Sequence, residues 1–170
     1  APSDEPELFP LAQTEGWTEA LLRDHDRLAE LEQTYGLTAQ TVVNYHLGFD
    51  GAYFTIPLPT TLKDGKLAVK RHRRGQQPKA RHPANVPAQL YGAETLKDAP
   101  NGSLVIVTGG ELKRLLLVQM GFLAVSGTTG EGAFPSAWAE VFRGKDFNVA
   151  IIDDVDKAGL AGAEKPAVVL

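Results

Sequence analysis

The sequence has 170 residues, of which 43% are hydrophobic and 22% are charged, as in an ordinary folded protein of one or two small domains. Its formal net charge is −4, and it has no cysteine, which excludes disulfide bonds and cysteine-ligated zinc. It has neither the apolar run of about 18 residues that spans a membrane nor an N-terminal signal-peptide pattern. We therefore expect a cytoplasmic protein, and the absence of a heptad pattern favours a monomer.

The N-terminal part predicts an arm followed by helices. Residues 1–13 are acidic and proline-rich, which favours a flexible arm; an arm docked through Leu8 and Phe9 is the alternative. Residues 14–46 have helical periodicity with an apolar leucine stripe. We expect Thr18 to begin a first helix, Gly36 to end it and Thr38 to begin a second helix.

Residues 52–75 predict a β-meander, with a strand over 53–58 and a hairpin turn at Asp64-Gly65. Eight of the 17 Lys and Arg residues lie in the interval 63–81, which contains a single acidic residue. Because the whole chain is acidic, this asymmetry is typical of a nucleic-acid surface, whereas a solvated charged hairpin is the alternative. The residues expected to bind nucleic acid are Lys70, Arg71, Arg73, Arg74, Lys79 and Arg81.

Two short apolar runs, 104–107 and 149–152, are each closed by polar residues. Such runs predict buried parallel strands, and the leucine-rich segment 111–120 between them predicts a helix. The carboxyl ends of parallel strands form the sheet edge at which ligands bind. Both runs therefore deliver their polar residues to one candidate site.

Acidic residues at this edge predict a divalent cation site. Asp154 and Asp156 are two residues apart, so in an extended chain both carboxylates point to the same side. Glu111, at the end of the other strand, could add a third carboxylate, and Mg²⁺ prefers such oxygen ligands. The alternative is a solvated acidic loop that caps a helix.

The two motifs, Gly109-Gly110-Glu111 after the first strand and Asp154-Val155-Asp156-Lys157-Ala158-Gly159 after the last, resemble those of a Toprim domain, the metal-binding module of primases and topoisomerases. The Gly/Thr-rich segment 121–130 resembles the second strand and loop of that family. Gly109 stands where the family has its first, catalytic Glu. Three interpretations stay open: an engineered substitution, a natural loss of activity, or transfer of the role to Glu111.

The order of features upstream resembles the catalytic core of bacterial and phage DNA primases. It comprises a helical lead-in, Gly48-Phe49-Asp50, a hairpin with a basic strand, and Gln89-Leu90-Tyr91-Gly92 before the Toprim-like part. The resemblance implies an α+β fold in which residues 14–97 form a small template-binding subdomain with a β-meander. Residues 98–170 then form a Toprim-like parallel-sheet domain that is truncated at its C-terminus.

The resemblance also implies an activity, namely metal-dependent synthesis of RNA primers on single-stranded DNA with Mg²⁺ or Mn²⁺. Asp154, Asp156 and Glu111 would be the catalytic metal ligands, joined by Asp153, and Lys113 and Arg114 would contact the triphosphate of a ribonucleotide. The implied partners are the template and a replicative helicase, in a bacterial cell or encoded by a phage or plasmid. A Toprim nuclease and a non-catalytic binding module remain the alternatives.

Overall fold

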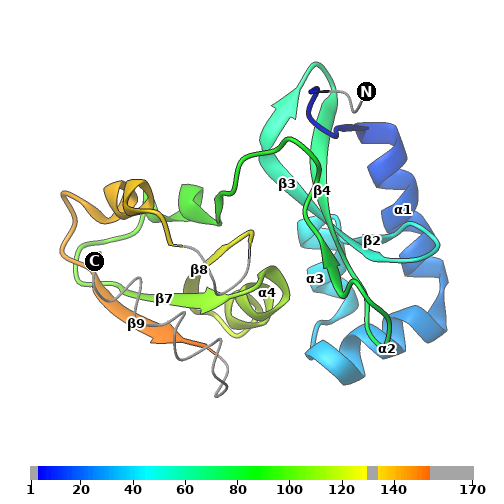
Figure 1. Ribbon diagram of the computed structural model, residues 1–170. Coiled ribbons are helices and arrows are strands. Elements are labelled where there is room, and N and C mark those ends of the chain that lie inside the picture. The colour runs from blue at the N-terminus through cyan, green and yellow to red at the C-terminus, as the bar shows by residue number, and fades with distance from the viewer. Residues whose placement is uncertain (1–3, 130–133, 154–170) are drawn as a thin grey trace. The chain divides into compact units, whose positions relative to one another are not determined.

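The computed structural model describes residues 4–129 and 134–153 (Figure 1). The chain forms two compact units, residues 1–87 and 88–170. The sequence placed this boundary between residues 97 and 98. It lies earlier because β6 (Leu90–Tyr91) pairs with β8 (Leu123–Gly127) of the second unit. Within the described residues, no helix is long and apolar enough to cross a membrane.

Unit 1 combines an antiparallel sheet with three helices. The sheet order is β1-β4-β3-β2, and β5 also pairs with β4. The elements in chain order are β1 (Phe9–Pro10), α1 (Leu11–Arg23), α2 (His25–Tyr35), α3 (Ala39–Tyr45), β2 (Gly48–Phe49), β3 (Phe54–Lys63), β4 (Lys66–His72) and β5 (Ala80–Arg81).

The N-terminal segment is docked, so the expectation of a flexible arm is wrong for the residues from Glu7 onward. Glu7 donates its backbone N–H to the carbonyl of Ala84, and Phe9 pairs with Leu67 in the sheet. The ring of Phe9 also packs on Trp17, with ring centres 5.2 Å apart. The alternative of docking through Phe9 is therefore confirmed, because the apolar ring gains more by packing on α1 than the short arm loses in freedom.

The first helix begins earlier than expected, and it ends earlier too. Thr18 lies inside α1, where its hydroxyl donates to the carbonyls of Thr14 and His46, so its predicted role as an N-cap is wrong. The helical stretch breaks at Asp24, whose carboxylate accepts from the backbone N–H of Arg27 and so caps α2. The predicted left-handed cap at Gly36 and the N-cap at Thr38 are both confirmed.

The predicted hairpin is confirmed. β3 and β4 pair antiparallel with Phe54 opposite His72 and Thr55 opposite Arg71. Asp64 and Gly65 join the strands with φ values of 50° and 71°, the left-handed geometry that a two-residue hairpin turn requires.

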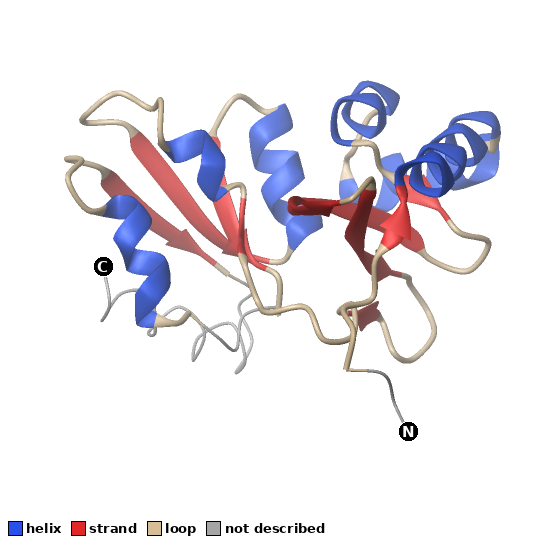
Figure 2. Ribbon diagram, turned by 90° about the horizontal axis from the view of Figure 1, so that it is seen from above, coloured by secondary structure: helices blue, strands red, loops and turns tan. Residues whose placement is uncertain are grey.

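Unit 2 is built on a mixed sheet of order β6-β8-β7-β9, in which the central β7 is parallel to both neighbours. Its remaining elements are the 3₁₀ helix η1 (Ala93–Leu96), β7 (Leu104–Gly109), α4 (Glu111–Gln119), the 3₁₀ helix η2 (Ser136–Phe142) and β9 (Asn148–Ile152). The predicted parallel strands and the helix between them are thus confirmed. Figure 2 shows helices on both faces of this sheet.

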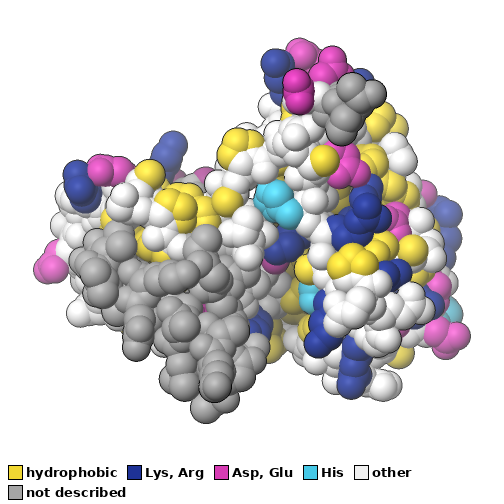
Figure 3. Space-filling view, in the orientation of Figure 1, with side chains coloured by type: hydrophobic (Ala, Val, Ile, Leu, Met, Phe, Trp, Pro, Cys, Tyr) yellow, Lys and Arg dark blue, Asp and Glu magenta, His cyan; other side chains and the backbone are white. Residues whose placement is uncertain are grey.

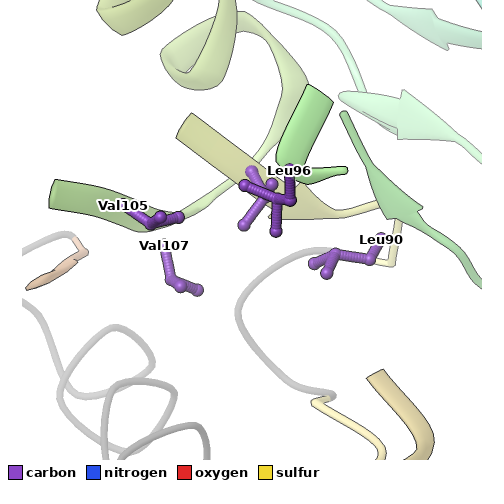
Figure 4. Close-up of a cluster of buried hydrophobic side chains, with 5 residues drawn as sticks. Leu90, Leu96, Val105 and Val107 are labelled. Carbon is purple, nitrogen blue, oxygen red and sulfur yellow. The ribbon is translucent and has the colours of Figure 1, made fainter. Parts of the chain in front are cut away.

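A hydrophobic cluster packs against one face of this sheet. Val105 and Val107 of β7 and Val125 of β8 meet Leu90 and Leu96, and all five side chains are buried (Figure 4). Aromatic side chains of the segment that follows β8 pack against the cluster: Phe134, Trp138, Phe142 and Phe147. The packing therefore anchors β7 and β8, whose carboxyl ends carry candidate site residues.

Candidate functional site

The carboxyl ends of three parallel strands in unit 2 lie at one sheet edge. Thr108 pairs with Ser126 on one side and with Ile152 on the other. Gly109 ends β7, Glu111 begins α4 directly afterwards, and Asp153 follows β9. The structure thus brings the predicted positions Gly109, Glu111 and Asp153 to the same edge, as the order of strands implied.

The carboxylate of Glu111 is buried, with 3% of the residue exposed. It occupies the first turn of α4, where the positive end of the helix dipole favours a negative charge. The residue before it, Gly110, has φ 92° and ψ 144°, a backbone conformation that L side chains rarely adopt. The strand-to-helix turn therefore relies on Gly110 to direct the glutamate into the edge of the sheet.

Of the other predicted acidic residues, the structure describes only Asp153. Asp153 is half-buried, whereas Asp154 and Asp156 lie outside the described residues. Across residues 4–129 and 134–153, no three His, Cys, Asp or Glu side chains are grouped closely enough to hold a metal ion. Glu111 and Asp153 carry carboxylate oxygens, the kind of group that a hard cation such as Mg²⁺ prefers, and Gly109 brings no side chain to the edge.

Arg114 corrects one expectation from the sequence. Only 1% of the residue is exposed, and its Nε donates to the carbonyl of Ala124 at 3.0 Å. Its guanidinium lies over the ring of Tyr91, and a Cβ on Gly92 would come within 2.5 Å of it. Arg114 therefore packs unit 2 internally instead of contacting a triphosphate, while its neighbour Lys113 is half-buried.

In unit 1, the six predicted nucleic-acid-binding residues come from β4, β5 and the loop between them. Figure 3 shows Lys and Arg side chains interleaved with hydrophobic ones on this unit. Arg74, Lys79 and Arg81 are exposed, and Arg73 is half-buried. The prediction that Lys70 binds nucleic acid is wrong. The residue is only 6% exposed within β4, so it cannot present its charge to a strand of nucleic acid.

Arg71 is also committed to the fold. Its Nη2 donates to Oε1 of Glu7 at 3.0 Å, and its Nε lies 3.3 Å from Oδ2 of Asp50. The guanidinium lies over the ring of Phe9, and the side chain is 14% exposed. Two carboxylates thus neutralise Arg71, and the cluster ties the N-terminal segment to β4.

Tyr53 organises the exposed basic residues that follow. The guanidinium of Arg73 lies 4.4 Å from the centre of its ring, and that of Arg81 lies 5.9 Å away. Arg73 also donates to the loop that follows, through Nε to the carbonyl of Pro78 at 3.2 Å and Nη1 to Oε1 of Gln76 at 3.1 Å. The sequence analysis missed this role of Tyr53; the available signal was an aromatic residue directly before β3, the strand that pairs with the basic β4.

His72 alternates with these residues and points to the other face of β4. Burial lowers its pKa, and the nearby charges of Lys70 and Lys79 lower the pKa further. Its Nδ1 lies 3.2 Å from the hydroxyl of Tyr35, whose own pKa is raised by burial and by Glu30, against a smaller opposite effect of Arg74. The surroundings of His72 in unit 1 therefore favour the neutral imidazole over the protonated one.

Comparison of the sequence with models of protein families and with curated protein sequences gives no match. Solved structures share the fold, including the following three. The Escherichia coli primase catalytic core matches with a TM-score of 0.64 at 17% identity, over 92% of this chain and 66% of that chain. The primase fragment of the bacteriophage T7 primase-helicase protein matches with a TM-score of 0.59 at 21% identity, over 81% of this chain and 59% of that one.

The third is a chain from a structure of bacteriophage T7 lagging-strand DNA polymerase interacting with primase domains bound to an RNA/DNA hybrid and dTTP. It matches with a TM-score of 0.55 at 21% identity, over 81% of this chain and 72% of that chain. The chain is thus an α+β protein that shares its fold with these primase structures. More narrowly, the chain has the fold of a bacterial or phage primase catalytic core, of which it spans 66% in the Escherichia coli case.

Proposed function

We propose that this chain is the core of a DNA primase, which synthesises RNA primers on a single-stranded DNA template with Mg²⁺ or Mn²⁺. One observation carries the proposal: the similarity to the Escherichia coli primase core extends over 92% of the chain and so includes both units. An unrelated Toprim-type enzyme would share the parallel sheet of unit 2 but would have no reason to share the basic hairpin of unit 1.

The proposed division of labour follows from the described residues. In unit 2, Glu111 and Asp153, with Asp154 and Asp156 beyond the described residues, would hold the ion. A bound divalent ion would offset the negative charge of a triphosphate during nucleotidyl transfer. Burial at the start of α4 keeps the carboxylate of Glu111 oriented. Lys113, two residues further along α4, would pair with phosphate oxygens.

Template binding would rest on the exposed part of the basic segment in unit 1. Arg74, Lys79 and Arg81 can approach phosphates, whereas Arg71 and Arg73 position the strand and loop that carry them. Phosphate contacts of this kind give affinity that is independent of base sequence and weakens with salt. We extend the proposal to a replicative helicase as partner, because the T7 fragment comes from a primase-helicase protein.

The test is primer synthesis on single-stranded DNA with labelled ribonucleotides and either Mg²⁺ or Mn²⁺. The chain is assayed beside its Gly109→Glu variant and a Gly109→Gln variant, which adds the same bulk without a charge. We expect Gly109→Glu to be the more active chain by at least about tenfold, because an additional carboxylate strengthens the ion site. Primer synthesis that is absent in every chain, while DNA binding persists, would refute the enzymatic proposal.

A second candidate function is a non-catalytic single-strand-binding module, and Gly109 is the observation that favours it. The strand end carries no side chain where a catalytic carboxylate would stand. Salt-sensitive binding to single-stranded DNA without incorporation in any variant would support this module. A nuclease is the less favoured alternative, and cleavage of a labelled oligonucleotide in the same reactions would identify it.

A further inference from the structure

Unit 1 contains a cavity that shares Arg73 and Arg74 with the proposed template-binding segment but extends beyond that segment to α2 and to the rings of Phe49 and Phe54. It has a volume of about 280 Å³ and is formed by α2, the segment from β2 to β3, and the loop after β4. Its lining includes the arginines Arg27, Arg73 and Arg74, the rings of Phe49 and Phe54, and one acidic residue, Glu30. The cavity is thus cationic, yet it has aromatic walls.

The arginines reach the cavity from α2 and from the loop after β4, and Arg27 and Arg74 each have a protein partner. Arg27 of α2 pairs with Glu30 and lies 4.8 Å from the centre of the Phe49 ring. Arg74 donates through Nη1 to the hydroxyl of Thr34 at 3.3 Å. Since a guanidinium has five N–H donors, each of these side chains keeps donors for a ligand after its protein contact.

The aromatic part of the lining limits what the ligand can be. Phe49 and Phe54 pack with ring centres 5.5 Å apart, and Phe54 is buried. Aromatic rings beside arginines are the surface on which nucleobases stack, while the arginines pair with phosphate. The volume lies just below the range of about 300 to 1,000 Å³ that is typical of small-molecule sites, which suits one compact group better than a duplex.

We propose that this cavity binds one nucleoside phosphate, with its phosphate on Arg27 and Arg74 and its base against Phe49. The ligand chemistry has two possible sources, a free nucleotide or one nucleotide of a bound single strand. The first source is independent of the proposed primase function, and only the second rests on it.

The experiment uses the whole chain and amide NMR spectra, with Gly51 and Ala52 at the cavity as reporters. Adenosine monophosphate, adenosine, inorganic phosphate and a short oligo(dA) are titrated in turn. We expect saturable shifts with adenosine monophosphate at an affinity at least about tenfold above those of adenosine and phosphate, because base and phosphate contribute together. Equal affinity for phosphate or adenosine alone would overturn the nucleotide assignment.

Variants then locate the binding. Arg27→Gln and Arg74→Gln should each lower the affinity for adenosine monophosphate by about tenfold, because each removes one charge-assisted contact with the phosphate. Arg23→Gln on α1 removes the same charge from an exposed arginine outside this cavity and should leave the affinity unchanged. Loss in the control as well as in the cavity variants would overturn the proposal.

The oligonucleotide arm separates the two sources. If adenosine monophosphate shifts the reporters and oligo(dA) does not, the site binds free nucleotide. If both ligands shift them and Arg74→Gln reduces both effects, the site also binds a nucleotide of a single strand. No shift at Gly51 or Ala52 with either ligand would overturn the proposal. That result would leave primer synthesis, which is measured separately, as the test of the primase function.

Discussion

The guanidinium of Arg114 lies 4.8 Å from the centre of the Tyr91 ring, and it packs so closely on Gly92 that a Cβ at Gly92 would overlap it. This arrangement joins β6 to α4 across β8, whose Ala124 carbonyl accepts from Arg114. A charged side chain thus serves as a packing element, and Gln89-Leu90-Tyr91-Gly92 belongs with unit 2 because of it.

Arg114→Ala should destabilise the protein by about 3 kcal/mol or more, because it opens a cavity and removes a buried charge-assisted hydrogen bond. Gly92→Ala should also be destabilising, since φ at this position is 88° and the new methyl would meet the guanidinium. Urea unfolding of both variants measures the effect. The exposed Arg143→Ala is the control and should change stability by less than about 0.5 kcal/mol.

Stability near neutral pH should depend on His72. Its pKa is lower in the folded chain than in the unfolded chain, so the unfolded state binds more protons as pH falls. The contribution of His72 is therefore complete above its ordinary pKa of about 6.5 and is lost as pH falls through that value towards the folded pKa. His72→Gln, which can still contact the Tyr35 hydroxyl, should remove this part of the pH dependence.

The measurement for His72 is the difference in unfolding free energy between parent and His72→Gln at a series of pH values from about 5 to 8, around the ordinary histidine pKa. We expect the parent to lose more stability than the variant on acidification. Parallel curves for the two proteins would show that His72 titrates in the folded chain as it does in the unfolded chain. Carboxylates that titrate in the same range affect both proteins and cancel in the difference.

Single-stranded DNA binding should separate the exposed arginines from the structural ones. Arg74→Gln and Arg81→Gln should each weaken binding and lower the salt slope by about 0.7, the value for one phosphate contact on a single strand. Arg71→Gln should mainly lower the unfolding free energy, by about 1 to 3 kcal/mol, because it removes the ion pairs with Glu7 and Asp50.

Fluorescence anisotropy with a labelled oligonucleotide at several salt concentrations, beside urea unfolding, makes this distinction. Arg23→Gln, with the same change of charge on α1, is the control for net charge. A salt slope that falls equally in the control and in Arg81→Gln would mean that the exposed arginines act only through the overall charge of the protein.

The sequence predicted the elements whose signals are local. The Asp64-Gly65 hairpin, the Gly36 and Thr38 caps and the parallel strands around Leu104–Gly109 follow from turn chemistry and apolar runs, and they formed as expected. The basic segment was also found, but a count of charges cannot tell which residues face inward. Strand alternation places Lys70 and Arg71 on opposite faces, and both are enclosed.

Other features depended on contacts between residues far apart in the sequence. The docking of Glu7 depends on Arg71 and on Ala84, and nothing in the local composition of an acidic, proline-rich segment indicates such partners. Burial of Arg114 depends on Gly92, whose missing side chain makes room for the guanidinium. The sheet edge with Glu111 and Asp153 could be predicted because parallel strands bring their carboxyl ends together whatever their side chains.

The turn between β7 and α4 should tolerate substitution at Gly109 but not at Gly110. Gly110 has φ 92° with open space where an added methyl group would stand, so Gly110→Ala meets conformational strain alone and should cost about 1 to 2 kcal/mol. The φ of Gly109 is not positive, so Gly109→Ala meets no such backbone strain and should cost less than Gly110→Ala. Urea unfolding of the two alanine variants compares them directly. A larger loss of unfolding free energy for Gly109→Ala than for Gly110→Ala would mean that a side chain at position 109 disturbs the sheet edge. A Gly109→Glu protein without primer synthesis would then indicate a misfolded site and not the absence of an activity.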